Sequence, residues 1–243
     1  MAGQDVTSRV SQVRLDRAGV VVVVGTFLGP VIEGALLFGA AGTLDLPRAW
    51  LFLGLSMVGM FGQVVLLARA NPELVNHRGR WKQKKDAKAW DRVLVPLYGV
   101  CAFYAVPAVA GLDVGRYQWS NLGSWAAILG TLLFAGGTVV MTWAMLINRH
   151  FEAIVRIQTD REHRVVTAGP YAIVRHPGYV GAALWALAAP LIVGSGWGLI
   201  PAAAAVAVLV IRTVLEDKTL RAELPGYADY AAKTRYRLLP GIY

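Results

Sequence analysis

Five long stretches of this chain carry almost no charged side chains, and they restrict its fold more than any other feature. They are residues 18–44, 49–68, 93–112, 117–147 and 177–211. The first contains one acid, Glu33, and the other four contain no Lys, Arg, Asp or Glu. A helix needs about 20 mostly apolar residues to cross a bilayer. Only 16% of the chain is charged, against about 25% in soluble domains. The sequence therefore predicts an all-α, polytopic integral membrane protein.

The last apolar stretch is too long for one span and short for two. Gly194-Ser195-Gly196 lies in its middle and is a turn signal. We predict a tight C-terminal helical hairpin with two shortened arms, near 179–193 and 197–211. Arms of this length need shielding by other helices or a bilayer that adapts to them. With one span in each of the other stretches, the chain has about six transmembrane helices.

The positive charges test this arrangement. Of the 24 Lys and Arg residues, six spans place 22 on one side and only Arg48 and Arg116 on the other. Cytoplasmic loops are enriched in Lys and Arg. We therefore expect the protein to lie in a bacterial inner (plasma) membrane. Both termini, and an active site if the chain has one, should face the cytoplasm. The formal net charge of +9 then reflects loops that face anionic lipid, and nucleic acid is not an expected partner.

The composition changes once, after Ile147. We predict a four-span membrane region at 1–147 and a second region at 148–243, made of a cytoplasmic segment, the hairpin and a cytoplasmic tail. The basic loop from Arg78 to Arg92 is typical of a helix lying on anionic lipid. Small residues in the spans permit an oligomer without requiring one.

Two polar segments flank the hairpin and hold most of the candidate chemistry. Arg175 and His176 stand just before it, and Arg212 and Glu216 follow it, four residues apart on one helix face. Because a hairpin returns the chain to the side it left, these four residues should converge. Glu33 is a functional candidate because a carboxyl group inside a span is costly. It could also lie near the outer edge or pair with another helix.

Other site types have little support in the sequence. The four His residues show no metal-ligand spacing, and the single Cys excludes an intrachain disulfide. We find no phosphate-binding loop, no nucleophile elbow and no dinucleotide-binding glycine pattern after a strand.

Three pieces of the second region together resemble a known family. They are HRVVTAGPYAIVRHPGYVG at 163–181, RTVLEDKTL at 212–220 and YADY at 227–230. The combination is similar to the isoprenylcysteine carboxyl methyltransferases, whose wider group includes membrane phospholipid methyltransferases. The resemblance covers roughly 148–243. It implies a multi-span enzyme that uses S-adenosyl-L-methionine as methyl donor and acts on a lipophilic or prenylated acceptor, among membrane lipids.

The resemblance also implies site residues. The cofactor would be surrounded by His163, Val166, Gly169, Tyr171, His176, Pro177, Tyr179, Glu216 and Asp217. The family has Glu-Glu where this chain has Glu216-Asp217, so we favour Glu216 as the group that binds the methionine ammonium. Arg175 and Arg212 would hold an anionic substrate, and with Glu216 they form the expected catalytic set.

Two alternatives stay open at this stage. The same C-terminal arrangement resembles membrane sterol reductases that use NADPH, although their hairpin usually begins HPNY where this chain has HPGY at 176–179. A non-catalytic membrane protein is the second alternative. The methyl acceptor, and whether oxygen, nitrogen or sulfur is methylated, are not indicated by the sequence.

Overall fold

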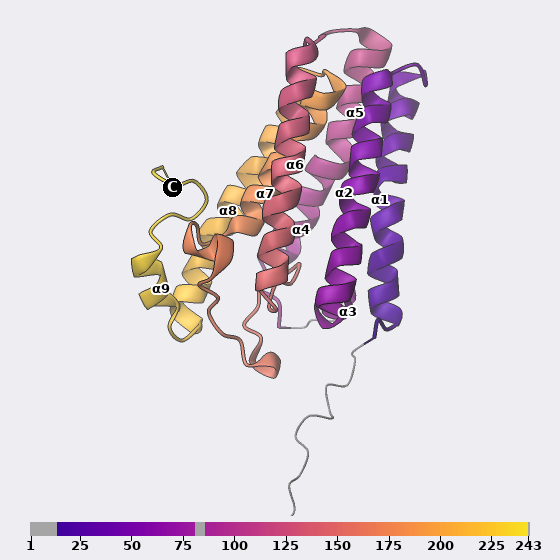
Figure 1. Cartoon of the computed structure of the whole chain (residues 1–243). Helices are drawn as coiled ribbons and strands as arrows, with labels where there is room; N and C mark the ends of the chain where they lie inside the picture. Colours follow the sequence, from indigo (N-terminus) through magenta and orange to yellow (C-terminus); the bar gives the residue numbers. More distant parts are fainter. Residues whose placement is uncertain (1–13, 81–85, 243) are drawn as a thin grey trace, which may run out of the picture.

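The computed structural model describes residues 14–80 and 86–242, and the described part contains helices and loops without a β-strand (Figure 1). The predicted all-α fold is confirmed. The α-helices are α1 (Arg17–Ala41), α2 (Pro47–Ala70), α3 (Pro72–Gly79), α4 (Asp91–Gly99), α5 (Val106–Gly111), α6 (Ser124–Ile147), α7 (Pro177–Val193), α8 (Leu199–Glu223) and α9 (Tyr227–Lys233). The π-helical segment η2 (Val100–Ala105) joins α4 to α5, and a second one, η3 (Leu112–Tyr117), extends α5, so Asp91–Tyr117 is one continuous helix.

Five helices of the described chain are long and apolar enough to cross a membrane. They are α1, α2, the continuous helix Asp91–Tyr117, α6 and α8. Helix α7 is apolar but shorter, at 17 residues or about 25 Å. Most of its residues are buried by the surrounding helices, as expected for a shielded hairpin arm. The six predicted spans are therefore present as helices.

The second hairpin arm is the apolar part of a longer helix. Helix α8 runs without a break from Leu199 to Glu223, so Arg212 and Glu216 lie on one helix, as predicted. Its polar C-terminal turns, with Arg212 and Glu216, extend the apolar arm as one rigid helix. The charged residues after Ile211 therefore mark the end of the membrane-spanning part of α8, but the helix itself continues past them.

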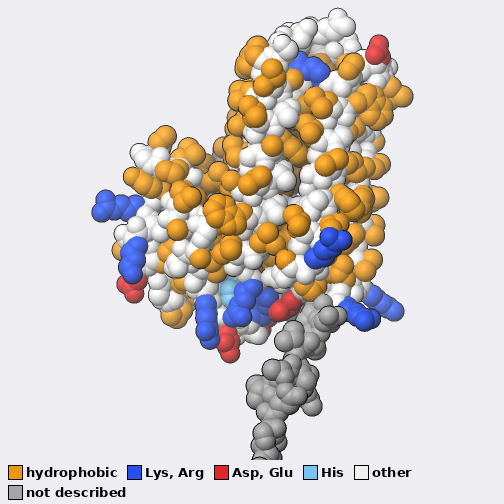
Figure 2. Space-filling model, in the orientation of Figure 1, with side chains coloured by type: hydrophobic (Ala, Val, Ile, Leu, Met, Phe, Trp, Pro, Cys, Tyr) orange, Lys and Arg blue, Asp and Glu red, His pale blue; other side chains and the backbone are white. Residues whose placement is uncertain are grey.

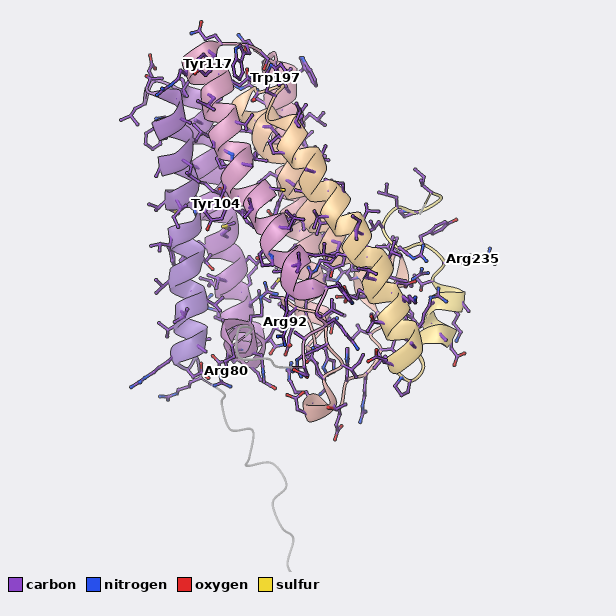
Figure 3. The ribbon with its side chains drawn as sticks, turned by 180° about the vertical axis from the view of Figure 1, so that it is seen from behind. Arg80, Arg92, Tyr104, Tyr117, Trp197 and Arg235 are labelled. Atoms are coloured by element: carbon purple, nitrogen blue, oxygen red, sulfur yellow. The ribbon has the colours of Figure 1, made fainter. Side chains whose placement is uncertain are left out.

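The basic residues divide between the two ends of the bundle as predicted. Arg48 and Arg116 lie at the end where the hairpin turns, and Figure 2 shows few other charged side chains there. Figure 3 places Tyr117 and Trp197 at that end, with Arg80 and Arg92 at the opposite end. Three ion pairs join segments at this second end: Arg80 to Asp16, Arg161 to Glu73 and Lys88 to Glu223.

Helices α6 and α7 approach each other closely through glycine. A Cβ on Gly181 would lie 2.8 Å from the carbonyl oxygen of Gly137, and a Cβ on Gly137 would lie 2.9 Å from that of Gly181. Only glycine therefore allows this contact, which fixes α7 against α6.

The basic loop does not form the surface helix that we predicted, so far as it is described. Arg78 belongs to the end of α3, residues 86–90 form turns, and α4 begins at Asp91. Residues 81–85 lie outside the described residues. Lys88 donates a backbone hydrogen bond to the carbonyl of Val155, so this loop packs on the segment after α6.

Candidate functional site

A cavity opens where the hairpin meets the polar segment after α6. Its empty space, which includes the open mouth, is about 810 Å³. Nine of the predicted site residues line it: His163, Val166, Tyr171, Arg175, His176, Pro177, Tyr179, Arg212 and Glu216. The predicted convergence of the two flanking segments is confirmed, with Nδ1 of His176 4.0 Å from Oε2 of Glu216.

Glu216 is the acid that faces this cavity. Its side chain is about one-fifth exposed, and its Oε2 accepts a hydrogen bond from the hydroxyl of Tyr179. Among the described residues, no hydrogen bond engages Oε1. The carboxylate is thus held in one orientation while one oxygen can still accept a hydrogen bond.

Asp217, the neighbouring acid, does not line the cavity. Its side chain is 1% exposed and accepts hydrogen bonds from three arginines. They are Arg175 at 2.7 Å, Arg221 at 3.1 Å and Arg237 at 3.1 Å. The hydroxyl of Tyr227 also donates a hydrogen bond to Asp217, at 3.0 Å. Side chains at adjacent helix positions point about 100° apart. Glu216 therefore faces the cavity, whereas Asp217 faces the arginines.

Arg175 ties the C-terminal tail to the hairpin. Besides Asp217, it donates to the carbonyl oxygens of Thr234 and Arg235, each at 2.7 Å. The backbone adds two further hydrogen bonds, from Arg175 to the carbonyl of Tyr236 and from His176 to that of Arg237. Arg175 reaches the cavity wall, but most of its donors are already bound to protein. Its surroundings indicate a structural role more than substrate binding.

Arg212 is held by an acid that the sequence analysis did not single out. Its Nε and Nη2 bind Asp91 at 2.5 and 3.0 Å, and Nη2 also donates to the carbonyl of Ala153. Asp91 is fully buried and also accepts from the backbone N–H of Val155. No hydrogen bond from Nη1 joins Arg212 to another described residue. This pair with Asp91 replaces the i,i+4 pair with Glu216 that the spacing suggests.

His176 and Tyr179 form the wall between the two acids. Pro177 is the first residue of α7 and fixes the turn at His176. The rings of His176 and Tyr179 stack at 5.7 Å, and the guanidinium of Arg212 lies 5.0 Å from the Tyr179 ring centre. Nε2 of His176 lies 3.7 Å from Oδ1 of Asp217, so the imidazole lies between the carboxylates of Glu216 and Asp217.

His163 reaches the cavity from the loop after α6. Burial, together with the nearby His150 and Arg156, lowers the pKa of its imidazole to about 4. The imidazole is therefore neutral at physiological pH. Because Nδ1 accepts the backbone N–H of Gln158 at 3.4 Å, Nε2 carries the proton and is the donor.

Tyr171 and Val166 line the cavity, whereas Gly169 does not. Gly169 has a φ of +60°, and a Cβ there would lie 3.1 Å from Nε1 of Trp143, so it shapes the loop. The carbonyl of Tyr171 accepts a hydrogen bond from the hydroxyl of Tyr230 at 2.6 Å. This bond joins the YADY piece to the loop.

Several lining residues escaped the sequence analysis. They include Asn148, His150, Phe151, Glu152, Arg156, Gln158, Tyr227 and Tyr230. Most belong to the segment directly after α6, whose fold depends on Arg156. Its guanidinium binds Glu152 at 2.7 Å and Asp160 at 2.8 Å. The i,i+4 spacing of these charges was the one signal that could have identified this segment.

Comparison with known proteins bears on the same region. Residues 125–224 match the family model described as phospholipid methyltransferase. Over this stretch, which is less than half of the chain, the sequence is similar to that family. The match begins inside α6, earlier than the resemblance read from the sequence, and ends before the YADY piece. The division of the chain at residue 147 stays a prediction.

The chain is also similar to individual proteins over part of their length. It is 34% identical to protein-S-isoprenylcysteine O-methyltransferase B of Arabidopsis thaliana, over 30% of this chain and 34% of that protein. It is 44% identical to protein-S-isoprenylcysteine O-methyltransferase of Schizosaccharomyces pombe, over 20% of each. The cobalt-zinc-cadmium resistance protein CzcN of Cupriavidus metallidurans is 30% identical over 56% of this chain and 60% of that protein. The chain thus spans about a third or less of the methyltransferases that it matches.

Proposed function

We propose that this protein transfers a methyl group from S-adenosyl-L-methionine to a lipophilic acceptor. The observation that carries the proposal is Glu216, a half-buried carboxylate with one oxygen unbound, in the cavity of a methyltransferase-family region. The cavity lies at the basic end of the bundle. By the positive-inside rule that end faces the cytoplasm, where a water-soluble cofactor is available.

The chemistry of the lining residues fits this cofactor. Glu216 would bind the methionine ammonium through a charge-assisted hydrogen bond, with Tyr179 holding its second oxygen in place. Neutral His163 offers a donor that suits a ribose hydroxyl or a purine nitrogen. Leu220 and Leu224 supply an apolar wall on which a base can lie. Asp217 would act as a positioning residue, because its oxygens are occupied by arginines.

The remaining chemistry needs alignment more than a strong catalyst. S-Adenosyl-L-methionine supplies a methyl group on a sulfonium, whose sulfur keeps the bonding electron pair when the methyl leaves. Nη1 of Arg212 would orient an anionic acceptor such as a carboxylate, which is already ionised and needs no base. An amine or thiol acceptor must lose a proton, and His176 or Glu216 would accept it. An isoprenoid carboxylate is the acceptor that the named relatives suggest.

Binding measurements separate this proposal from the reductase alternative. The purified full chain is titrated by calorimetry with S-adenosylmethionine, S-adenosylhomocysteine and NADPH in parallel. The proposal predicts micromolar binding of the first two and none of the third. Binding of NADPH alone would establish the reductase alternative, and binding of none of the three would favour a non-catalytic protein.

A further inference from the structure

A second cavity lies inside the helical bundle, away from the candidate active site. Its empty space is about 360 Å³. It is lined by Glu33, Phe52, Ser56, Met60, Tyr98, Ala102, Phe103, Phe134, Trp185, Ala186 and Ala189. These residues come from α1, α2, the continuous helix Asp91–Tyr117, α6 and α7. Glu33 is 16 residues after Arg17 and thus about 24 Å along α1, well inside the span.

Two polar side chains of this cavity, Glu33 and Ser56, have no hydrogen-bond or ion-pair partner within the described chain. Glu33 is 5% exposed and Ser56 is 2% exposed. Neither side chain forms a hydrogen bond or an ion pair with another described residue, so the predicted pairing of Glu33 with another helix is absent from this part of the chain. A buried polar group without a partner is costly, more so in a membrane. Such a group calls for a ligand that supplies the missing donor.

Aromatic side chains make up much of the remaining wall, together with Met60 and three alanines. Phe52, Tyr98, Phe103, Phe134 and Trp185 all contribute side chains. Hydrogen bonds fix two of these rings, because the Tyr98 hydroxyl donates to the carbonyl of Ala182 at 3.1 Å and Nε1 of Trp185 donates to Thr138 at 3.0 Å. Aromatic faces attract organic cations through their quadrupoles. One carboxyl group among several rings is the chemistry that recognises an alkylammonium.

The backbone around the cavity is also unusual. Ala102 and Phe103 belong to the π-helical segment η2, and π-helical turns occur often at functional sites. Tyr98, one turn earlier, is within electrostatic reach of both Glu33 and Arg212. Tyr98 lines this cavity and not the candidate active site. Along α7, Ala186 lies about 10 Å beyond Tyr179 of the active site.

We propose that the Glu33 cavity binds the ammonium group of a lipophilic amine that enters from the membrane. Glu33 would be the counter-ion and Ser56 an additional polar contact, while the five aromatic rings surround the methylene or methyl groups on nitrogen. The apolar surroundings require a ligand with an alkyl or isoprenoid chain. This proposal does not depend on methyl transfer, because the two cavities use different residues.

The test compares a cation with an uncharged molecule of equal chain length. The full chain is placed in nanodiscs of zwitterionic lipid and titrated with dodecyltrimethylammonium or with dodecanol, with empty nanodiscs as background. We expect the ammonium probe to bind wild type at least ten-fold more tightly than dodecanol. Glu33→Gln should abolish this preference, whereas Glu162→Gln, which changes an exposed acid, should keep it.

A second variant tests the same cavity without changing Glu33, as a control for loss of folding. Ala186→Leu fills the cavity but leaves Glu33 intact, and it should also weaken binding of the ammonium probe at least ten-fold. Binding of S-adenosylmethionine by both variants is measured in parallel and should match wild type, so failure of this proposal is distinguishable from failure of the active-site proposal. Equal affinity of wild type for the two probes, or an ammonium preference that survives Glu33→Gln, would overturn it.

Discussion

Glu216 and Glu33 each line a cavity, but their surroundings differ in a way that separates two kinds of site. Around Glu216 the protein supplies its own partners: Tyr179 binds the carboxylate, Asp91 binds Arg212, and Asp217 binds three arginines. Around Glu33 the described chain supplies none, and much of the wall is aromatic. The first cavity is preorganised by ionic contacts, whereas the second leaves its charge to a ligand. The predictions below test this contrast.

The largest effect is expected at Asp217. Asp217→Asn leaves Arg175, Arg221 and Arg237 without their shared carboxylate, and removing one partner of a buried ion pair costs about 3–5 kcal/mol. The free energy of unfolding in mixed micelles should fall by about that amount. Asp229→Asn, on the exposed side of α9, is the matched control and should change it little. A loss below about 1 kcal/mol would show that the arginine cluster does not hold the tail.

Glu216 should affect ligand binding more than folding. Glu216→Gln removes the charge that we assign to the methionine ammonium, and a hydrogen bond to a charged group contributes about 1.5–3 kcal/mol. Affinity for S-adenosylmethionine, measured by calorimetry, should fall about 10- to 100-fold while the free energy of unfolding stays near that of wild type. The reverse pattern would assign Glu216 to the structure instead of the site.

A smaller effect should appear as a pH dependence of stability. Burial lowers the pKa of His163 from its ordinary 6.5 to about 4, so between these values the unfolded chain takes up a proton that the folded chain does not. Stability should therefore decrease as pH falls from about 6.5 to 4. Because the ring is partly exposed, we expect about 1–2 kcal/mol from it. Unfolding of wild type and His163→Gln at several pH values gives the difference, and a difference that is constant with pH would contradict the assignment.

The smallest effect is expected at Glu33. Glu33→Gln breaks no contact with a described residue, so the free energy of unfolding without ligand should change by less than about 1 kcal/mol. Denaturant titration in mixed micelles measures it beside Asp217→Asn. A loss as large as that of Asp217→Asn would mean that Glu33 has an essential partner within the protein, and the contrast between the two cavities would fail.

The sequence predicted the parts of the fold that depend on local composition. Uncharged stretches identified the spans, and Gly194 to Gly196 identified the hairpin turn. The convergence of His176 with Glu216 followed from the hairpin alone. The i,i+4 spacing of Arg212 and Glu216 indicated a helix beyond Ile211, and α8 continues to Glu223.

The missing parts of the site depend on contacts distant in sequence. Asp91 lies 121 residues from Arg212, and nothing local distinguishes it from other acids in a basic loop. The separate surroundings of Glu216 and Asp217 likewise depend on where Tyr179 and the tail arginines pack. Likeness to a family placed both acids at the cofactor, whereas the structure places only Glu216 in the cavity wall.

Methyl transfer itself is the most direct test of the central proposal. Tritium-labelled S-adenosylmethionine, labelled on the methyl group, is incubated with the protein in nanodiscs and with a lipid extract of the organism's own membranes. The account predicts label in the organic phase with wild type and with Asp229→Asn, and at least a ten-fold lower initial rate with Glu216→Gln at subsaturating donor. No transfer above background by a wild-type protein that binds the donor, or equal rates for wild type and Glu216→Gln, would contradict it.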